Sequence, residues 1–299
     1  MATFAHVPQL RDIESAGGRR LRLEIAGDGR RVIVAQVGTP QAGVLYDRWV
    51  TDAGERDLTL ISYDRPGYGG SSPQSGRTVA DCVADLRAIS RTIGFERCAV
   101  WGFSGGGPHA LAGAALADDL VAAVATIGSP APPDAVGLDY LAGLSDDARR
   151  DLELFRADRH EWELLGHRQG EELLALTAGQ LAEQWSVGAA PADTAALDGE
   201  FGIWLHEAVQ AAVAPGVEGW MADNIAIFHS AWGVDLASIS VPVKVWHSRD
   251  DRFVPFQHGC WLADTVASAQ AELREHDGHL SVVASRIGDV HEWLAQYLE

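Results

Sequence analysis

The most constraining feature of this sequence is a serine set among glycines, G-F-S-G-G at residues 102–106, between an apolar run that ends at Trp101 and a helical pattern over residues 108–117. This is the pattern G-x-S-x-G in the order strand, turn, helix. The turn is too tight for bulky side chains beside the serine, which accounts for the glycines. The following helix directs its amino terminus at the serine hydroxyl and favours developing negative charge there. A phosphate-binding loop would need a lysine after the glycines, and none is present. Ser104 is therefore predicted to be a nucleophile.

Short apolar runs rich in β-branched residues alternate with helical patterns along most of the chain. The buried strands are expected at residues 32–37, 58–63, 98–101, 121–127 and 241–246, with more polar outer strands at 21–25 and 271–276. One helix is expected to start at Thr78, with Asp81 completing a capping box, and to stop at Gly94. A second amphipathic helix is expected at residues 281–298. This alternation predicts an α/β fold with a mostly parallel central sheet and helices on both faces, formed by residues 1–130 and 231–299.

Strand signals are missing from residues 131–230, which we call the inserted segment. Helical patterns at 146–165, 170–185 and 200–214 follow one another there. The segment holds 18 acidic and 5 basic residues, so it carries most of the net charge of −19. We expect a helical cap, or lid, over Ser104. The alternative is that the segment only thickens the domain or forms a homodimer contact.

A serine nucleophile needs a base, and the base needs an acid that orients it. The best placed of the 11 histidines is His279, predicted on a loop between the last strand and the last helix. We expect His276 on the last strand, His247 at the end of the strand before it and His258 on the helix between them, where each is less able to reach Ser104.

Two adjacent carboxylates, Asp250 and Asp251, follow the predicted strand at residues 241–246. One is expected to contact the histidine, and the other to be solvated or ion-paired in the loop. Their positions alone leave the choice open.

Together these blocks resemble the α/β-hydrolase superfamily, in its lid-bearing serine hydrolase branch. The resemblance is carried by V-G-T-P at residues 37–40, Y-D-R-P-G-Y-G at residues 63–69, the serine motif and the blocks around the acid and His279, and it covers nearly the whole chain outside the cap. It implies the α/β-hydrolase fold and a catalytic triad in the chain order nucleophile, acid, base.

In that family the acid block has the pattern H-G-x-x-D-x-x-V-P. Counting back from V-P at residues 254–255 gives Asp251 rather than Asp250, with Ser248 at the usual glycine. The triad implied by the resemblance is therefore Ser104, Asp251 and His279.

The resemblance also implies an oxyanion hole formed by the backbone N–H groups of Thr39 and Gly105. The family's oxyanion loop usually begins with histidine, where this chain has Val37. We expect Asp64 and Arg65 to form a structural pair that braces the loop after their strand.

A serine at this position argues against the superfamily members that use a carboxylate nucleophile, the epoxide hydrolases and haloalkane dehalogenases. Acyl transfer to water then remains, and it needs no cofactor and no metal. The H-E pairs at residues 160, 206 and 291 lack the second histidine of a zinc motif.

Aromatic residues recur in the inserted segment and suggest a medium-sized, largely apolar acyl group. We expect Phe103, Trp185 and Trp204 to contact this small-molecule substrate. The acidic cap leaves room for a cationic substrate, as in a proline-iminopeptidase-like aminopeptidase. A C–C bond hydrolase or a lactonase would use the same triad, and a non-catalytic binding protein on this scaffold is the alternative from another class.

Composition bounds the remaining possibilities. Hydrophobic residues make up 47% and charged residues 22% of the 299, as in an ordinary globular protein. A net charge of −19 disfavours nucleic acid and anionic membranes as partners. The three cysteines match no zinc or disulfide framework, which is consistent with free thiols in the cytoplasm.

Overall fold

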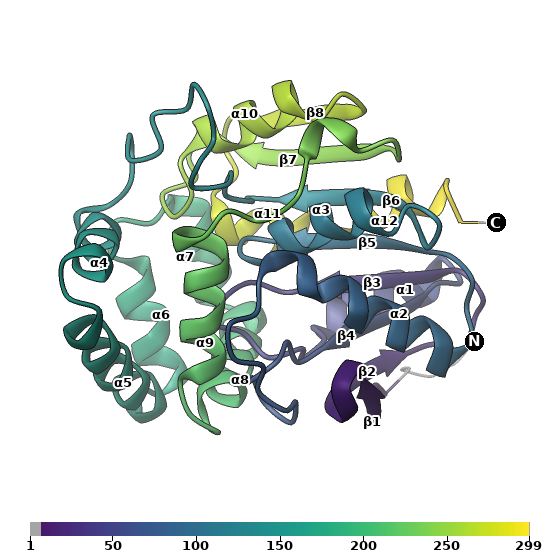
Figure 1. Ribbon diagram of the computed structural model, residues 1–299, viewed down its shortest axis with the longest axis horizontal. Coiled ribbons are helices and arrows are strands. Elements are labelled where there is room, and N and C mark those ends of the chain that lie inside the picture. Colours follow the sequence, from purple (N-terminus) through teal and green to yellow (C-terminus); the bar gives the residue numbers. More distant parts are fainter. Residues whose placement is uncertain (1–6, 299) are drawn as a thin grey trace.

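The computed structural model describes residues 7–298, which form one eight-stranded sheet with helices on both faces (Figure 1). The strands are β1 (Gln9–Ser15), β2 (Arg19–Ala26), β3 (Val32–Gln36), β4 (Thr59–Tyr63), β5 (Cys98–Phe103), β6 (Val121–Ile127), β7 (Val243–Ser248) and β8 (Ala269–Arg274). Their order across the sheet is β1-β2-β4-β3-β5-β6-β7-β8. β1 with β2 and β2 with β4 are antiparallel, and all other neighbours are parallel. The predicted mostly parallel α/β sheet is confirmed.

The four central strands, β3 to β6, consist entirely of buried residues. Continuous apolar runs of this kind are expected where helices cover both faces of a parallel sheet. The outer strand β8 starts two residues earlier than expected and ends at Arg274. The prediction that His276 lies on this strand was therefore wrong.

Strand β1 was not predicted. Its sequence, QLRDIES, is mostly exposed, and only Ile13 and Ser15 are buried. A strand that pairs along one edge and faces solvent over most of its length lacks the regular apolar alternation that would reveal it.

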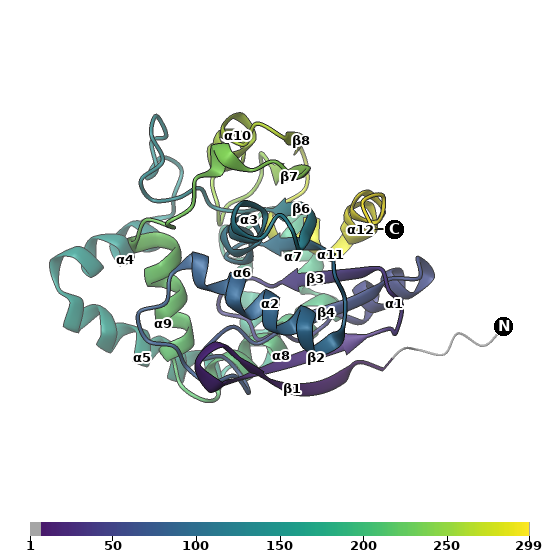
Figure 2. The same ribbon diagram turned by 45° about the vertical axis from the view of Figure 1, so that its right-hand side comes forward.

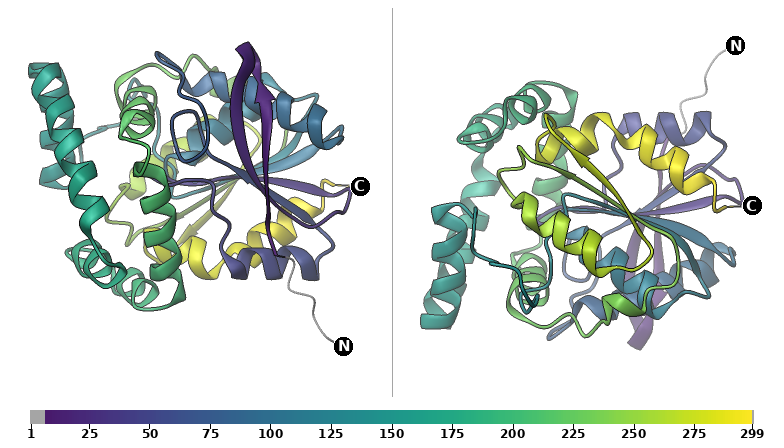
Figure 3. Two further views of the ribbon diagram at one scale, coloured as in Figure 1. Left: turned by 90° about the horizontal axis from the view of Figure 1, so that it is seen from below. Right: turned by 90° about the horizontal axis from the view of Figure 1, so that it is seen from above.

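The helices outside the inserted segment cover the two faces of the sheet in two groups (Figure 3). One face holds α1 (Asp47–Glu55), α11 (His279–Ser285) and α12 (Ile287–Ala295), and the other holds α2 (Cys82–Ile93), α3 (Gly106–Leu116) and α10 (Phe256–Thr265). Trp49 and Trp293 belong to the first apolar core, and Leu86, Leu111 and Leu262 to the second.

The predicted capping residues of the helix after Thr78 are present, whereas the C-terminal helix differs from its prediction. The capping box of Thr78 and Asp81 is present before α2, and Gly94 ends that helix in the left-handed conformation. The single C-terminal helix predicted at residues 281–298 is wrong, because the backbone leaves helical geometry at Arg286 and divides it into α11 and α12. His279 is the first residue of α11 rather than a loop residue.

Between β6 and β7 every regular element is helical, as expected for the inserted segment. Its helices are α4 (Asp146–Ala157), α5 (Arg159–Ala175), α6 (Ala178–Ser186), α7 (Pro191–Leu197), α8 (Glu200–Val213) and α9 (Glu218–Asn224), followed by a short π-helix at Ile225–His229. Two predicted helices are interrupted, because Asp158 and Thr177 each cap a new helix with their side chains. In the part of the chain that is described, no helix is both long and apolar enough to cross a membrane.

These helices lie together beyond one end of the sheet (Figures 1 and 2). Helix α8 attaches them to α1 through aromatic rings. Trp204 packs 4.7 Å from Trp49 and 5.6 Å from Tyr46, measured between ring centroids, and its Nε1–H donates to the Val44 carbonyl at 3.0 Å. Trp204 is thus part of the apolar contact between the inserted segment and α1.

Candidate active site

Ser104 lies on the turn between β5 and α3, and the local sequence explains its conformation. Its φ of 51° is in the left-handed region, which non-glycine residues rarely adopt. A Cβ added at Gly102 would overlap the carbonyl of Gly106, and one at Gly106 would overlap the carbonyl of Gln36. Glycines on both sides therefore allow a turn that carries the serine out of the end of the strand.

His279 and Asp251 are in direct contact, although they are 28 residues apart. The Nδ1 atom of His279 lies 2.7 Å from Oδ2 of Asp251, and both residues are buried. The other carboxylate oxygen, Oδ1, accepts the backbone N–H groups of Phe253 at 2.9 Å and Val254 at 2.8 Å. Both carboxylate oxygens thus accept hydrogen bonds, and these hold the carboxylate toward the imidazole.

The two groups of this pair stabilise each other's charge. Burial raises the pKa of Asp251, but the charge and hydrogen bond of His279 outweigh it, so the net pKa lies below the ordinary value. Burial also lowers the pKa of His279, and Asp251 outweighs that effect and raises the pKa above the ordinary value. The arrangement favours a histidine that can take up a proton while it remains bonded to a carboxylate.

The competing residues lie elsewhere. Asp250 is 3.9 Å from Arg252, an ion pair in the loop, and does not contact His279. His247 is buried behind Asp251 at 3.4 Å, with its Nε2 2.9 Å from the Val254 carbonyl.

Thr39 and Gly105, the residues expected to form the oxyanion hole, lie side by side. A Cβ added at Gly105 would come 2.7 Å from Cγ2 of Thr39. The Thr39 hydroxyl is also 2.7 Å from the hydroxyl of Tyr68, which is fully buried. The loop that carries Thr39 is thus packed between the serine turn and the residues that follow β4.

The directions of the Thr39 and Gly105 N–H groups are set by hydrogen bonds to the carbonyl oxygen of the same peptide group. The Thr39 N–H shares a plane with the Gly38 carbonyl, which accepts from Nη2 of Arg65 at 2.8 Å. The Gly105 N–H shares a plane with the Ser104 carbonyl, which accepts a backbone N–H of the first turn of α3 at 2.9 Å. Because the peptide group is planar, holding the carbonyl also sets the direction of the N–H on the opposite side.

Arg65 does not pair with Asp64, and that expectation was wrong. Asp64 instead accepts the backbone N–H groups of Gly43 at 2.8 Å and Gly70 at 2.7 Å. Arg65 turns the other way and binds Asp223 of α9 at 2.6 Å. The short-range pairing that the sequence suggested is replaced by a partner 158 residues away.

A cavity of about 380 Å³ joins the serine turn to the inserted segment. Ser104, His279 and Thr39 line it, together with Phe103 and Trp185. The aromatic residues of its wall are Phe103, Tyr140, Trp185, Trp220, Phe228 and Phe253. Helices α4, α5, α6 and α9 all contribute to this wall, and Trp204 does not.

The polar residues of the cavity wall include two carboxylates, Asp147 and Asp151, and no arginine or lysine. Asp151 is held by Nε1–H of Trp162 at 3.0 Å, and burial raises its pKa. Among the described residues, the wall therefore offers an anionic substrate no arginine or lysine to balance its charge.

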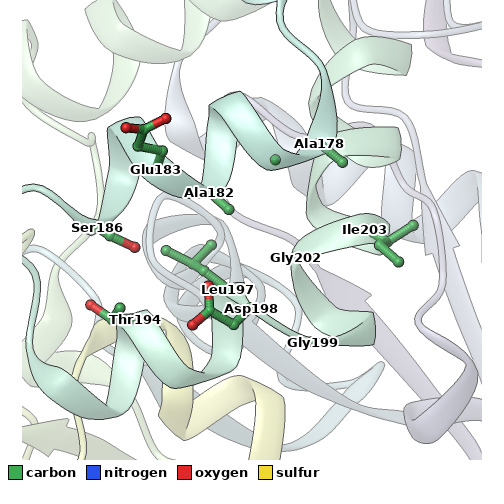
Figure 4. A pocket seen from close by; sticks show the side chains of 11 residues that line it. Ala178, Ala182, Glu183, Ser186, Thr194, Leu197, Asp198, Gly199, Gly202 and Ile203 are labelled. Carbon is green, nitrogen blue, oxygen red and sulfur yellow. The ribbon is translucent and has the colours of Figure 1, made fainter.

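A second hollow, of about 430 Å³, lies within the inserted segment between α6, α7 and α8 (Figure 4). Figure 4 shows Glu183, Thr194 and Asp198 around it, together with the small residue Ala182. None of the residues predicted to be catalytic lines it. In residues 7–298, no group of three or more histidine, cysteine, aspartate or glutamate side chains is arranged to hold a metal ion.

Several residues that surround the predicted triad were not identified from the sequence. A Cβ at Gly128, where φ is +57°, would come 2.9 Å from Nδ1 of His279 and 3.2 Å from Oδ2 of Asp251. Asp193 accepts the backbone N–H of His279, and Asp223 holds Arg65. A glycine directly after a predicted buried strand was the available signal for Gly128, while nothing in the sequence distinguished the two aspartates.

Comparison with known proteins agrees with this fold. The chain is 24% identical over 262 residues to an AB hydrolase superfamily protein, YisY, of Bacillus subtilis (strain 168), covering 87% of this chain and 88% of that protein. Among solved structures it resembles an esterase from Exiguobacterium antarcticum (TM-score 0.70, 19% identity, 96% of this chain and 100% of that one). It also resembles an enol-lactonase from Burkholderia xenovorans LB400 (TM-score 0.69, 18% identity, 97% and 99%). The family model for the alpha/beta hydrolase fold matches residues 32–283, and this chain therefore belongs to the α/β-hydrolase fold family.

Proposed function

We propose that this protein is a serine hydrolase that cleaves an ester, or a related acyl bond, of a small to medium, largely apolar substrate through an acyl-enzyme. One observation carries the proposal. Ser104, on its left-handed turn, and His279, bonded through Nδ1 to the buried Asp251, line the same cavity.

In the proposed mechanism, Oγ of Ser104 attacks the carbonyl carbon while Nε2 of His279 removes its proton. Asp251 holds the imidazole with its proton on Nδ1 and stabilises the imidazolium that forms. The N–H groups of Thr39 and Gly105 stabilise the oxyanion. His279 then gives the proton to the leaving group, and a water molecule, activated in the same way, releases the acid.

The wall of the cavity supports a largely apolar acyl group, because six aromatic side chains line it. Asp151, a half-buried carboxylate on the same wall, gives specific support to a second candidate, an aminopeptidase that binds a free amino group, whereas Asp147 is exposed and pairs with Arg150 at 3.2 Å. A cationic group would be attracted to the Asp151 carboxylate, and an anionic one would be repelled.

We also propose that the inserted segment, residues 131–230, acts as a lid that selects the acyl group. Four of its helices supply cavity wall opposite the catalytic groups, and they pack over the carboxyl ends of the strands, where open α/β sheets bind ligands. Closing such a lid would shield the bound acyl group from bulk solvent, while the single water molecule that hydrolyses the acyl-enzyme still has to enter.

Labelling with a fluorophosphonate tests the proposed chemistry, with Ser104→Ala as the matched control. We expect wild-type protein to be labelled and to hydrolyse p-nitrophenyl esters, and Ser104→Ala to be folded, unlabelled and slower by about 10⁶ in kcat. Ester turnover by Ser104→Ala within tenfold of the wild type would refute the assignment.

A substrate panel separates the candidates. We expect p-nitrophenyl esters of medium acyl chains to be cleaved faster than aminoacyl amides, lactones or vinylogous diketones. If the aminoacyl amides were the best substrates, the second candidate would replace the first.

A further inference from the structure

Asp193 of the inserted segment makes a set of contacts that the proposed mechanism does not use. It lies in the first turn of α7 and is completely buried. Its Oδ2 accepts the backbone N–H of His279 at 2.8 Å, and its Oδ1 accepts those of Leu280 and Ser281, each at 2.8 Å. These three residues form the first turn of α11 and lie 86 to 88 residues away along the chain.

The contacts satisfy a specific need of α11. The first N–H groups of a helix have no acceptor within the helix, and the capping position before this one is Gly278, which has no side chain to supply an acceptor. A Cβ at Gly278 would overlap the Asp193 carboxylate, so glycine is what allows the carboxylate to come this close. A negative charge at a helix N-terminus is also favourable to the helix dipole.

The first N–H in this set belongs to His279 itself. Two carboxylates therefore hold the same histidine from different elements. Asp251, after β7, binds its ring, and Asp193, on α7, binds its main chain. A shift of α7 would move the backbone from which the imidazole projects.

We propose that Asp193 is a positioning residue for His279, so that the inserted segment fixes the placement of this histidine from outside the triad. The inference rests on the proposed role of His279 as the general base. It differs from a purely structural cap because a buried charge at this place acts on the imidazole as well as on the helix.

The surroundings of His279 support the electrostatic part. The titratable groups near it are Asp251, His247 behind that carboxylate, and Asp193; Asp277 is engaged in ion pairs of its own. After burial, which lowers it, and Asp251, which raises it most, the charge of Asp193 raises the pKa of His279 further. Loss of that charge is therefore expected to lower the pKa of the imidazole.

The test is Asp193→Asn, which keeps the shape of the side chain and removes its charge and one acceptor. We expect phosphonylation of Ser104 by a fluorophosphonate to slow by about 10²-fold, the order found when a reacting group is displaced by about an ångström. In a plot of the labelling rate against pH, the midpoint of the acid limb should move to lower pH. The fluorophosphonate concentration that half-saturates the labelling rate should stay close to that of the wild type.

Two control variants separate this role from simple stabilisation. Asp158→Asn removes another helix-capping carboxylate of the inserted segment, one that accepts the Glu161 N–H at 3.0 Å on the surface. Asp85→Asn removes a buried carboxylate that binds Arg19 at 2.8 Å and does not line the cavity. Neither change should move the pH midpoint, even where the free energy of unfolding falls.

A second variant and a second readout keep the inference testable if Asp193→Asn does not fold. Gly278→Ala displaces the carboxylate without removing its charge, and it should also slow labelling. In the Ser104→Ala background, the pKa of His279 can be followed by ¹⁵N NMR without any substrate, and Asp193→Asn should lower it.

The outcomes are distinguishable. Labelling of Asp193→Asn at the wild-type rate with an unchanged pH midpoint would overturn the inference, as would a loss of rate that only follows the fraction unfolded. Failure of the wild type to be labelled would refute the proposed function instead, and the NMR titration would then decide the role of Asp193 alone.

Discussion

Removing one carboxylate, that of Asp223, is expected to destabilise the protein more than any surface change. Asp223 is fully buried and binds two guanidinium groups, Arg65 at 2.6 Å and Arg77 at 2.6 Å, which are also buried. Breaking a buried ion pair by removing one partner costs about 3–5 kcal/mol, because the other charge stays buried and uncompensated. Two cations share one anion here, so we expect Asp223→Asn to lie toward the upper end of that range.

Urea unfolding measures this loss, with Asp12→Asn as the control. Asp12 pairs with Arg22 at 2.8 Å, but both side chains are about two-fifths exposed. Exposed pairs of this kind contribute less than about 1 kcal/mol. If Asp223→Asn lowered the free energy of unfolding by less than about 1 kcal/mol, with an unchanged slope of that free energy against urea concentration, the reasoning would be refuted.

The pH dependence of the same difference gives a second check. Burial raises the pKa of Asp223, but Arg65 and Arg77 outweigh it, so the net pKa lies well below the ordinary value of a carboxyl group. For an acid with a lowered folded pKa, the stability it contributes is fully present above the unfolded pKa, about 3.9, and is lost as pH falls toward the folded value. The difference between wild type and Asp223→Asn should therefore be constant from pH 5 to 8 and shrink below about pH 4.

The same variant should also affect turnover if the proposed oxyanion hole is correct. Arg65 reaches the Val37 and Gly38 carbonyls at 2.6 and 2.8 Å, and the second of these shares a peptide plane with the Thr39 N–H. Without its anion, Arg65 is less firmly placed, and kcat should fall by as much as about 10²-fold, the effect of losing one oxyanion donor. Assays below the unfolding transition, on a short ester, separate this effect from loss of folded protein.

Three further outcomes are expected. Asp251→Asn should lower kcat by about 10⁴ because the imidazole would adopt the wrong tautomer, whereas Asp250→Asn should change kcat little. The opposite ranking in ester assays would show that Asp251 is not the acid of the triad. Gly128→Ala should lower kcat and also stability by more than about 1 kcal/mol, because its Cβ would press on the paired histidine at a positive φ; wild-type values of both would contradict the observed packing. Trp185→Ala should shift acyl-chain preference while short esters are still cleaved, whereas Trp204→Ala, away from the cavity, should cost about 3–5 kcal/mol of stability and leave the preference unchanged.

The parts of the fold that could be predicted from the sequence are those fixed by local rules. The buried runs at β3 to β6 contain little except apolar and β-branched residues, so a strand of the parallel sheet was the natural expectation. The glycines around Ser104 follow from steric exclusion within a few residues, and the overlaps at Gly102 and Gly106 are of that kind. Strand β1 and the break at Arg286 could not be predicted, because neither has a distinctive local pattern.

The choice of partners for charged residues was less predictable. Arg65 has an aspartate beside it in the sequence, yet it binds Asp223 and two backbone carbonyls. Sequence proximity suggested the wrong pair because the two neighbouring side chains face different parts of the protein: Asp64 accepts from the loop backbone at Gly43 and Gly70, and Arg65 faces α9. The correct partner depends on where α9 comes to lie, which helical periodicity does not specify.

The three buried aspartates near the cavity show why some roles are more visible in a sequence than others. Asp251 is balanced by a histidine and Asp223 by two arginines, so each has a partner of recognisable type somewhere in the chain. Asp193 is balanced by three backbone N–H groups, which every residue except proline possesses. Such a carboxylate has no complementary charged side chain that could be recognised in the sequence. The one sequence feature related to it is Gly278, whose lack of a side chain makes room for the carboxylate. The contribution that we propose for the inserted segment is therefore made through main-chain hydrogen bonds, which can be seen only in the folded arrangement.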